Sequence, residues 1–529
     1  MSKSLKHIGV LSFLTVVSRV LGLVRDMMAA SLFGTSLLYS AWVTAFSWPN
    51  LFRRLLGEGS MTAAFVPTLQ DELHAGGRPG AFALLSKVTS WLLVATGALV
   101  AVSMLALANA RVLGGHESRW YIAADLGVWL FPYMMLVCVA AGFNATLNVL
   151  ERFTEPALSP IWLNIAMILS LAGAGLHYAH SPLEEIHWLC AGVLVGGFFQ
   201  AAVPAGVLVR EGWRPRLDLG LSPRVREIAS LMTPGLFGTA IYQINILVSR
   251  QLAYSLNDSG ATLIFMGNRL MELPIGVFAI AVSTVVYPLL AKHATERNHA
   301  GLAQDFHKGL RLILVINVPA AAGLALLSAP IVRLLYERGH FNALDARNLS
   351  VVVALFCIGM PLFSVVNLTV RAFYAMKDIA TPVRVAAIDF CINLGLSLAL
   401  MRWLGIPGLV VASTTAIIAQ TYLLHRALVR RMPGMHFGPL LPGLAKVLCG
   451  AAAMAAVVAA GMRLLGAAGL GPRAYEVACV AGLIPVGVAA YAATLWLLRI
   501  EGREELAAVL ARLPLVGALF SRGPLTNAE

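Results

Sequence analysis

RVLGLVRDMMAASLFGTSLLYSAWVTAFSWPNLFRRLLGE, residues 19–58, is the stretch around which the rest of the chain is organised. Its apolar runs are long enough for two membrane-spanning helices, yet it carries six charged residues: Arg19, Arg25, Asp26, Arg53, Arg54 and Glu58. A charge at the centre of a bilayer costs at least ~2.5–3.5 kcal/mol per group. Four arginines at such a depth therefore need a wet cavity, paired carboxylates or an anionic ligand.

The depth of Arg19 is the strongest part of this argument. The first helix is expected over residues 7–33, with Arg19 twelve residues after His7. At ~1.5 Å per residue this is about 18 Å along the axis, past the middle of a ~30 Å apolar core. Pro49 indicates that the second helix, expected over residues 38–70, is kinked or interrupted. Irregular backbone at membrane depth is tolerated where it is packed or lines a cavity.

The charges of this stretch allow a structural and a functional interpretation. In the structural one, Arg25 pairs with Asp26, and Arg54 pairs with Glu58 four residues later on the same helix face. These pairs leave the other two arginines of the stretch without acidic partners. We therefore prefer the functional interpretation, in which the arginines line a cavity that binds a phosphate-bearing lipid.

The composition is that of an all-α polytopic membrane protein. The chain has 529 residues, of which 59% are hydrophobic and 12% charged, and its mean hydropathy is +0.78. Its six cysteines lie in apolar segments without metal-ligand or disulfide spacing, so no metal site is expected. The hydropathy pattern predicts fourteen spans, at residues 7–33, 38–70, 83–109, 120–149, 157–177, 187–209, 223–253, 261–291, 308–329, 349–376, 382–402, 406–428, 441–465 and 474–499.

The basic residues of the loops predict the orientation. The net charge of +13 lies in short loops between spans, which indicates the positive-inside signal and not a nucleic-acid partner. The even-numbered loops hold sixteen Lys and Arg residues against eight in the odd-numbered loops, and both termini add to the larger set. Both termini are therefore expected in the cytoplasm.

Two weak sequence matches at consistent spacing indicate an internal repeat. Residues 60–69 can be laid on residues 281–290, and the segment from Asn144 can be laid on that from Asn367. Six spans then repeat as six around a central cavity, as in many secondary transporters. The expected domains are lobes at residues 1–210 and 211–430, two additional helices at 431–500 that shape a groove for a lipid tail, and an amphipathic cytoplasmic tail at 501–529.

The second lobe has its own intramembrane polar groups. Arg269 in the eighth span is expected to join the arginines of the first lobe across the cavity, with Asn268 and Glu272 supporting it. A second group consists of Asp389 and Asn393 in the eleventh span and Asn245 in the seventh. A lone carboxylate among amides could hold Na⁺ or a proton for coupling. The alternative is hydrogen bonding between helices without an ion.

Several motifs together resemble the MurJ (MviN) family of bacterial lipid II flippases, in the multidrug/oligosaccharidyl-lipid/polysaccharide exporter superfamily. The first two are quite specific: SRVLGLVRD (18–26) and PNLFRRLLGEG (49–59). The others are AFVP (64–67), NRLMELP (268–274), ERGHF (337–341), and RAFYAMKD with TPV (371–383). The resemblance extends from residue 1 to about residue 430.

The resemblance implies a function that the residues alone do not. It implies transfer of lipid II, the undecaprenyl-pyrophosphate-linked disaccharide-pentapeptide, from the inner to the outer leaflet of the bacterial cytoplasmic membrane for peptidoglycan synthesis. The essential cavity arginines carry over to Arg19, Arg25, Arg53 and Arg269, with Arg54 and Glu58 beside them. It also implies that the last two helices shape a hydrophobic groove, and it allows cell-wall assembly proteins as further partners.

The chain departs from the family pattern at two positions. Ser40 stands where some members carry an aspartate early in the second span, and Asn268 stands where some carry an aspartate before the arginine of the eighth span. Whatever those carboxylates do, such as pairing with arginine during gating, must be done differently in this chain or not at all.

The preferred mechanism is alternating access, with a contribution from the membrane potential and no enzymatic step. A drug or organic-cation exporter of the same superfamily is disfavoured by four cavity arginines. A flippase for another polyprenyl-linked oligosaccharide would need the same pyrophosphate site and stays an alternative. An intramembrane enzyme is disfavoured because we find neither clustered aspartates for Mg²⁺ nor a nucleophile–base pair. An additional role as a scaffold stays open.

Overall fold

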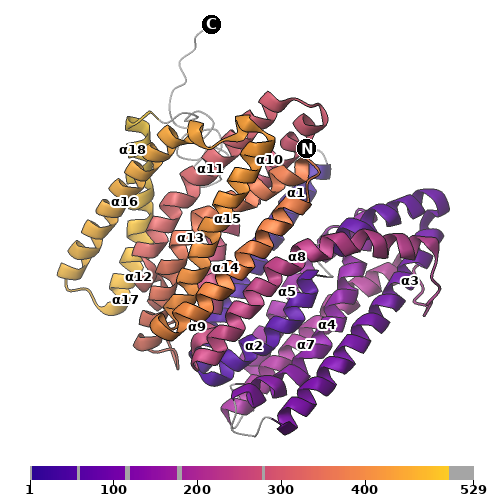
Figure 1. Cartoon of the computed structure of the whole chain (residues 1–529). Coiled ribbons are helices and arrows are strands. Elements are labelled where there is room, and N and C mark those ends of the chain that lie inside the picture. The colour runs from indigo at the N-terminus through magenta and orange to yellow at the C-terminus, as the bar shows by residue number, and fades with distance from the viewer. Residues whose placement is uncertain (1–2, 56–59, 114–118, 176–180, 277–279, 500–529) are drawn as a thin grey trace. The chain divides into compact units, whose positions relative to one another are not determined.

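A computed structural model describes residues 3–55, 60–113, 119–175, 181–276 and 280–499 (Figure 1). Within these ranges, residues 3–9, 12, 60–63, 110–113, 174, 175, 233–239, 280, 281 and 284 are described by their backbone alone. Glu58 and the expected cytoplasmic tail at 501–529 therefore lie outside the described residues.

The first half of the chain is a series of long helices with short connections. A π-helical turn at residues 53–55 follows α2, and α3 bends at Gly77, whose φ of 63° and ψ of −164° are not helical. The bounds are α1 (Lys3–Phe33), α2 (Leu37–Phe52), α3 (Ser60–Leu113), α4 (Arg119–Val149), α5 (Thr154–Leu169) with a π-helical end η2 (Ser170–Gly175), and α7 (Pro182–Arg210).

The second half is built in the same way. It contains one short helix that the hydropathy pattern does not predict, α12 (Ser328–Tyr336), because nine residues are too few to give a spanning signal. The other bounds are α8 (Pro223–Leu256), α9 (Gly260–Pro274), α10 (Ile280–Thr295), α11 (His299–Leu326), α13 (Ala343–Ala375), α14 (Ala380–Leu404) and α15 (Ile406–Arg431). The chain continues through η4 (Pro433–Met435), η5 (Gly438–Leu440), α16 (Leu441–Ala467), α17 (Pro472–Val477), η6 (Ala478–Leu483) and α18 (Ile484–Leu497).

Ten helical segments of the described residues are long and apolar enough to cross a membrane. They overlap the predicted spans three to six and nine to fourteen; the segment Arg119–Val149, for example, matches the predicted span 120–149, whereas Ala64–Asn109 begins well before the predicted span 83–109. Each of the other four predicted spans includes residues that are described by their backbone alone or not at all. The all-helical membrane fold is thus confirmed.

The helix bounds repeat at a nearly constant distance along the chain. Helices α9, α13, α14 and α15 begin 223, 224, 226 and 224 residues after α2, α4, α5 and α7. Left-handed residues recur as well, at Glu151 and Lys377 (φ 61° and 59°) and at Gly77 and Arg297 (φ 63° and 55°). The two sequence matches therefore belong to a repeat that includes these four helix pairs. The domain limits at residues 210, 430 and 500 stay a prediction.

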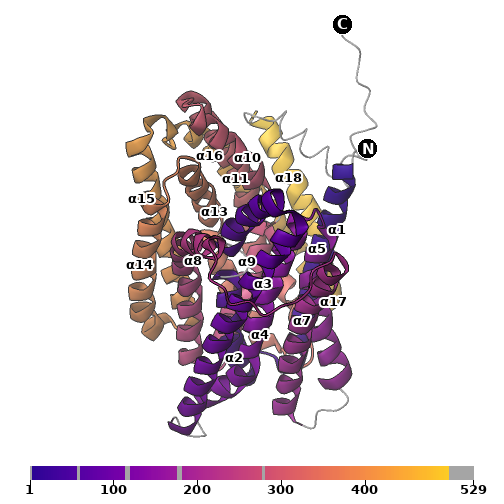
Figure 2. The ribbon, with the colours of Figure 1, turned by 90° about the vertical axis from the view of Figure 1, so that its right-hand side faces the viewer.

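The described residues form two compact units. Unit 1 comprises those of Met1–Met266, Leu335–Leu349 and Ala386–Ala412, and unit 2 comprises those of Gly267–Leu334, Ser350–Val385 and Ser413–Glu529. In unit 1, α4 packs against α2, α3 and α7 (Figures 1 and 2). In unit 2, α16 and α18 pack against each other and against α11, where the Tyr491 hydroxyl donates to the Val315 carbonyl at 2.7 Å.

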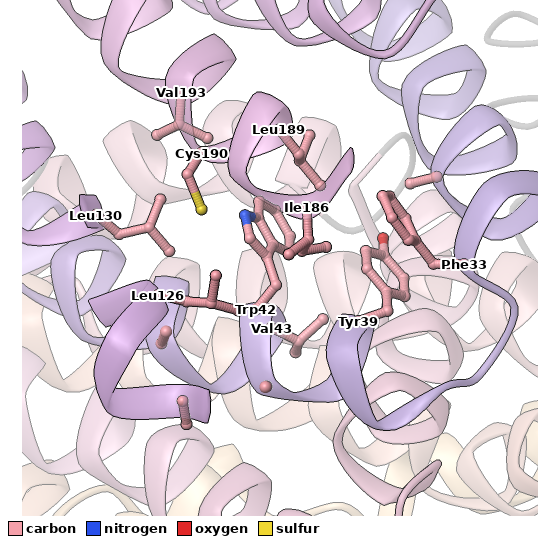
Figure 3. Close-up of a cluster of buried hydrophobic side chains, with 14 of the residues drawn as sticks. Phe33, Tyr39, Trp42, Val43, Leu126, Leu130, Ile186, Leu189, Cys190 and Val193 are labelled. Carbon is pink, nitrogen blue, oxygen red and sulfur yellow. The ribbon is translucent and has the colours of Figure 1, made fainter. Parts of the chain in front are cut away.

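A buried aromatic and aliphatic core holds α2 in place within unit 1. The side chains of Phe33, Tyr39 and Trp42 form a stacked series, with ring centroids 5.8 and 5.7 Å apart. Figure 3 shows the Trp42 indole among side chains of α4 and α7, namely Leu126, Leu130, Ile186, Leu189 and Cys190. This core fixes the helix that leads to the arginine pair at 53 and 54.

Candidate functional site

Arg25 and Asp26 form a buried ion pair that ties α1 to α5. The Arg25 Nη2 and Nε atoms lie 2.6 and 3.0 Å from Asp26 Oδ1, and Nη1 donates to Asn164 Oδ1 at 3.0 Å. Asn164 in turn donates to the Ser18 carbonyl at 3.1 Å. Arg25 is 9% exposed and Asp26 3%. Burying an ion pair costs free energy unless the remaining hydrogen-bonding groups of both side chains are satisfied. Asn164 satisfies one of these groups by accepting a hydrogen bond from Arg25.

Arg19 and Arg53 occupy different surroundings from Arg25. Arg19 is exposed on α1. It lies six residues before Arg25, roughly 120° around the helix, so the two guanidinium groups face different sides. Arg53 is half-buried at the start of the π-helical turn, where its Nε donates to the side chain of Asn50 at 2.9 Å. Asn50 follows Pro49, so the irregular end of α2 positions this arginine.

The pair predicted between Arg54 and Glu58 cannot be traced, because Glu58 lies outside the described residues. Arg54 is half-buried, and its Nε atom is buried without a hydrogen-bond partner among the residues that the structure describes. Its role beside Arg53 stays a prediction.

The polar residues predicted to face the arginines from the second half, Asn268, Arg269 and Glu272, lie on the part of α9 that belongs to unit 2. Arg269 and Asn268 are half-buried and Glu272 is exposed. A Cβ atom added at Gly267 would lie 2.7 Å from Val352 of α13, so the backbone just before Asn268 packs directly against that helix. The structure therefore describes this group within unit 2, and its approach to the arginines of the first half stays a prediction.

Asp389, Asn393 and Asn245 are brought together as the sequence predicted. Asn245 donates to Asp389 Oδ2 at 3.1 Å, and Asn393 donates to Asn245 Oδ1 at 2.6 Å and to the Ser249 hydroxyl at 3.2 Å. In this arrangement each amide oxygen accepts from a neighbour, since Ser397 donates to Asn393 Oδ1 at 3.4 Å. The cluster therefore links α8 to α14 by its own hydrogen bonds.

Ser40, the first departure from the family pattern, pairs with another hydroxyl. Its Oγ lies 2.9 Å from Thr262 Oγ1 of α9, and both residues are fully buried. Two hydroxyls can satisfy each other without a charge. A neutral contact thus stands at this position of α2.

Sequence reasoning missed two polar residues within these helices. Asn164 looked like an ordinary residue of an apolar span, yet it completes the Arg25 cluster. Arg250 of α8 donates to the Ser47 hydroxyl of α2 at 3.2 Å, and its guanidinium lies 5.4 Å from the Phe265 ring centre. The rule applied to Arg19, that a charge within a span requires a reason, would have found Arg250 as well.

Solved structures with the same arrangement of helices are transporters. One titled "Lipid II flippase MurJ, inward closed conformation" aligns with a TM-score of 0.77 at 23% identity, over 94% of this chain and 99% of that chain. An inward-facing multidrug resistance MATE family transporter of the MOP superfamily aligns with a TM-score of 0.59 at 13% identity, over 80% and 94%. The fold, with charged clusters inside its helices, is that of a polytopic helical membrane protein, and the described helices share it with these two structures.

Sequence comparison then identifies the family. The family model "Lipid II flippase MurJ" matches residues 29–472. A probable lipid II flippase MurJ of Haemophilus influenzae is 33% identical over 449 residues, 79% of this chain and 84% of that protein. One of Bdellovibrio bacteriovorus is 30% identical over 462 residues, 85% and 87%. The chain belongs to the lipid II flippase MurJ family.

Proposed function

We propose that this protein is a lipid II flippase, a transporter that moves the undecaprenyl-pyrophosphate-linked peptidoglycan precursor from the inner to the outer leaflet. The observation that carries the proposal is family membership over most of the chain, residues 29–472. The arginines of the predicted spans, Arg19, Arg25, Arg53 and Arg269, agree with a substrate that carries a pyrophosphate.

The proposed binding groups are Arg19, Arg53 and Arg269, which are exposed or half-buried. Arg25 lies six residues after Arg19 on the same helix and is buried. A planar guanidinium donates two parallel hydrogen bonds to a phosphate, and it keeps its charge at any physiological pH. Arg25 already directs three nitrogens at Asp26 and Asn164. We therefore assign direct contact with the pyrophosphate first to the other three arginines, and we assign the positioning of α1 to Arg25.

The test is retention of lipid II by the purified protein in native mass spectrometry. Arg19→Ala and Arg53→Ala should each lose bound lipid II, whereas Arg463→Ala, which removes an exposed arginine of α16, should retain it. Equal retention of lipid II by the parent protein and all three variants would mean that Arg19 and Arg53 do not bind the pyrophosphate. Preferred retention of another polyprenyl-linked saccharide would keep the mechanism and change the pathway. Retention of organic cations alone would favour a drug exporter.

We further propose that Asp389 is the coupling group, which holds either Na⁺ or a proton. Binding of Na⁺ would require the amides of Asn245 and Asn393 to turn their oxygens toward the ion, whereas a proton requires only the carboxylate. Flipping into proteoliposomes should then depend on a Na⁺ or a pH gradient in the parent protein and lose that dependence in Asp389→Asn. Flipping that ignores both gradients in the parent protein would remove the coupling role.

The proposed location is the bacterial cytoplasmic membrane, with both termini in the cytoplasm. In that orientation an inside-negative potential favours return of the empty cationic cavity, at ~2.3 kcal/mol per charge per 100 mV. A single cysteine at the exposed Ser36 and another in the loop at residues 212–222 should react with an impermeant maleimide from opposite sides of the membrane. Labelling of both from the same side would contradict the orientation, and flipping that is unaffected by collapse of the potential would contradict the voltage role.

A further inference from the structure

The motif ERGHF (337–341) has no role in the site described above, yet its backbone is interlocked with the turn between α1 and α2. The His340 N–H donates at 2.8 Å to the Ser31 carbonyl. Ser31 lies in the last turn of α1, where helix carbonyls have no partner within the helix. The motif therefore satisfies a helix end that lies more than 300 residues earlier in the chain.

Two glycines make this approach possible. Gly34 and Gly339 both have a φ of +58°, a conformation that L side chains rarely adopt. A Cβ atom at Gly34 would lie 2.6 Å from the His340 carbonyl oxygen, and one at Gly339 would lie 2.2 Å from the Ser31 carbonyl oxygen. Each glycine thus faces backbone of the other segment, and neither contact can relax by turning a side chain.

A side-chain contact fastens the same junction. Asn342 and Asp345 form a reciprocal cap at the start of α13: Asn342 N–H donates to Asp345 Oδ2 at 3.1 Å, and Asp345 N–H donates to Asn342 Oδ1 at 3.0 Å. The other carboxylate oxygen, Asp345 Oδ1, accepts from the hydroxyl of Thr35 at 2.5 Å. One carboxylate therefore both starts α13 and holds the α1–α2 turn.

We propose that these two segments, residues 31–36 and 337–345, form a turn clasp that closes one end of the transport path and must open before cargo leaves there. One segment belongs to the first half of the repeat and the other to the second half. A rocking motion that separates the halves at this end has to break the backbone contacts of both glycines together. The clasp would therefore act as a switch with a closed and an open state. This inference rests on the proposed flippase function.

The first experiment locks the clasp. Thr35→Cys and Asp345→Cys are introduced together into a chain whose six native cysteines have been replaced, and oxidation is followed by mass spectrometry of the cross-linked peptide. We expect fluorescent lipid II to bind the oxidised protein while its flipping in proteoliposomes falls to the protein-free background and returns on reduction. Undiminished flipping by fully cross-linked protein would overturn the proposal. Failure of the reduced protein to flip lipid II would instead count against the proposed function.

The second experiment needs no substrate. Ser40 is fully buried four residues after Ser36, so a cysteine at residue 40 of the same background reports whether the clasp is open. Its labelling by a maleimide should rise several-fold in Gly339→Ala. The matched control is Gly405→Ala, because Gly405 has a φ of +63° but nothing within 4 Å of an added Cβ. Equal labelling in the two alanine variants would show strain alone and overturn the clasp.

Discussion

The two halves of the repeat join their helices at the same places with opposite charges. In the first half, Arg152 lies two residues before α5 and pairs at 2.5 Å with Glu211, which follows α7. In the second, Asp378 lies two residues before α14 and pairs at 3.0 Å with Arg431, the last residue of α15. The residue before each, Glu151 or Lys377, is left-handed. Both halves therefore have the left-handed turn and the ion pair, but the basic and the acidic residue of the pair have exchanged places.

The polar junctions between α1 and α5 and between α8 and α14 follow the same rule. In the first half, α1 contributes an ion pair and α5 contributes the amide Asn164. In the second, α14 contributes the carboxylate Asp389 and α8 contributes the amide Asn245. Asn164 and Asp389 lie ten and nine residues after the starts of their helices. The position of a polar contact is therefore kept more strictly between the two halves than the residue type that supplies it. The physical requirement is only that polar groups within the helices are hydrogen-bonded.

The largest expected difference between the halves lies in these polar junctions. Arg25→Ala should lower the free energy of unfolding by ~3–5 kcal/mol, because it removes the cation that lies 2.6 Å from the buried Asp26 carboxylate. Asn245→Ala should cost only ~1–3 kcal/mol, the range for an unsatisfied buried polar group, because Asp389 is merely half-buried. Thermal unfolding in detergent measures both variants.

A double variant separates pairing from packing in this comparison. Arg25→Ala with Asp26→Ala removes both charges and should recover part of the stability that Arg25→Ala loses. If the double variant is less stable than the single one, loss of the Arg25–Asp26 pairing is not the cause of the lower stability.

The second expected effect concerns the contact between Arg250 and Ser47, for which the first half of the repeat has no equivalent arginine. Arg250 holds the Ser47 hydroxyl of α2, and by the offset of 223 residues its counterpart in α1 is the apolar Met27. Ser47→Ala should cost ~1.5–3 kcal/mol, the range for a hydrogen bond to a charged group. Thr44→Val on the same helix is the matched control, because the Thr44 hydroxyl is buried without a partner among the described residues. A loss of stability in Thr44→Val equal to that in Ser47→Ala would contradict the role of Arg250.

The third prediction compares these two helix junctions by single substitutions. Arg152→Ala should change stability by at most ~1 kcal/mol, because the Arg152 side chain is 46% exposed and surface pairs contribute little. Asp378→Ala should cost more, since Asp378 also accepts the Thr381 N–H at 3.1 Å as the cap of α14, a contact worth ~0.5–2 kcal/mol. Equal losses in the two variants would show that the cap contributes nothing.

The spans were predictable because apolar length is a local property of the sequence, and ten of them overlap a described helical segment. The contacts of Asp389 were predictable in part, since Asp389 and Asn393 are one turn apart on a helix. The partners of Arg25 were only half predictable. Asp26 is its neighbour in sequence, but Asn164 approaches through the fold.

The interlocked turns were not predictable from residue patterns. ERGHF is recognisable as a motif, but nothing in its composition indicates that Gly339 meets the Ser31 carbonyl. The same holds for Ser40, whose hydroxyl partner Thr262 lies on a helix 222 residues later. Such contacts depend on which helices pack against each other in the fold. The hydropathy and the periodicity of a segment do not indicate its neighbours.

The smallest expected effect is the pH dependence of the junction between Asp378 and Arg431. Burial alone would raise the pKa of Asp378, but hydrogen bonds from Thr381 and the charge of Arg431 outweigh it and hold the pKa below its usual range. A carboxyl with a depressed pKa stabilises the fold at pH values above its unfolded pKa of about 3.9, and this contribution is lost as the pH falls through the lower folded value. The stability advantage of the parent protein over Asp378→Asn should therefore be constant from neutral pH to about pH 5 and vanish in stronger acid. Arg431→Ala keeps the Thr381 hydrogen bonds, so it should lose only part of that advantage. An advantage that grows as the pH falls would mean that Asp378 is protonated more readily in the folded protein than in the unfolded chain, and that burial outweighs the cap.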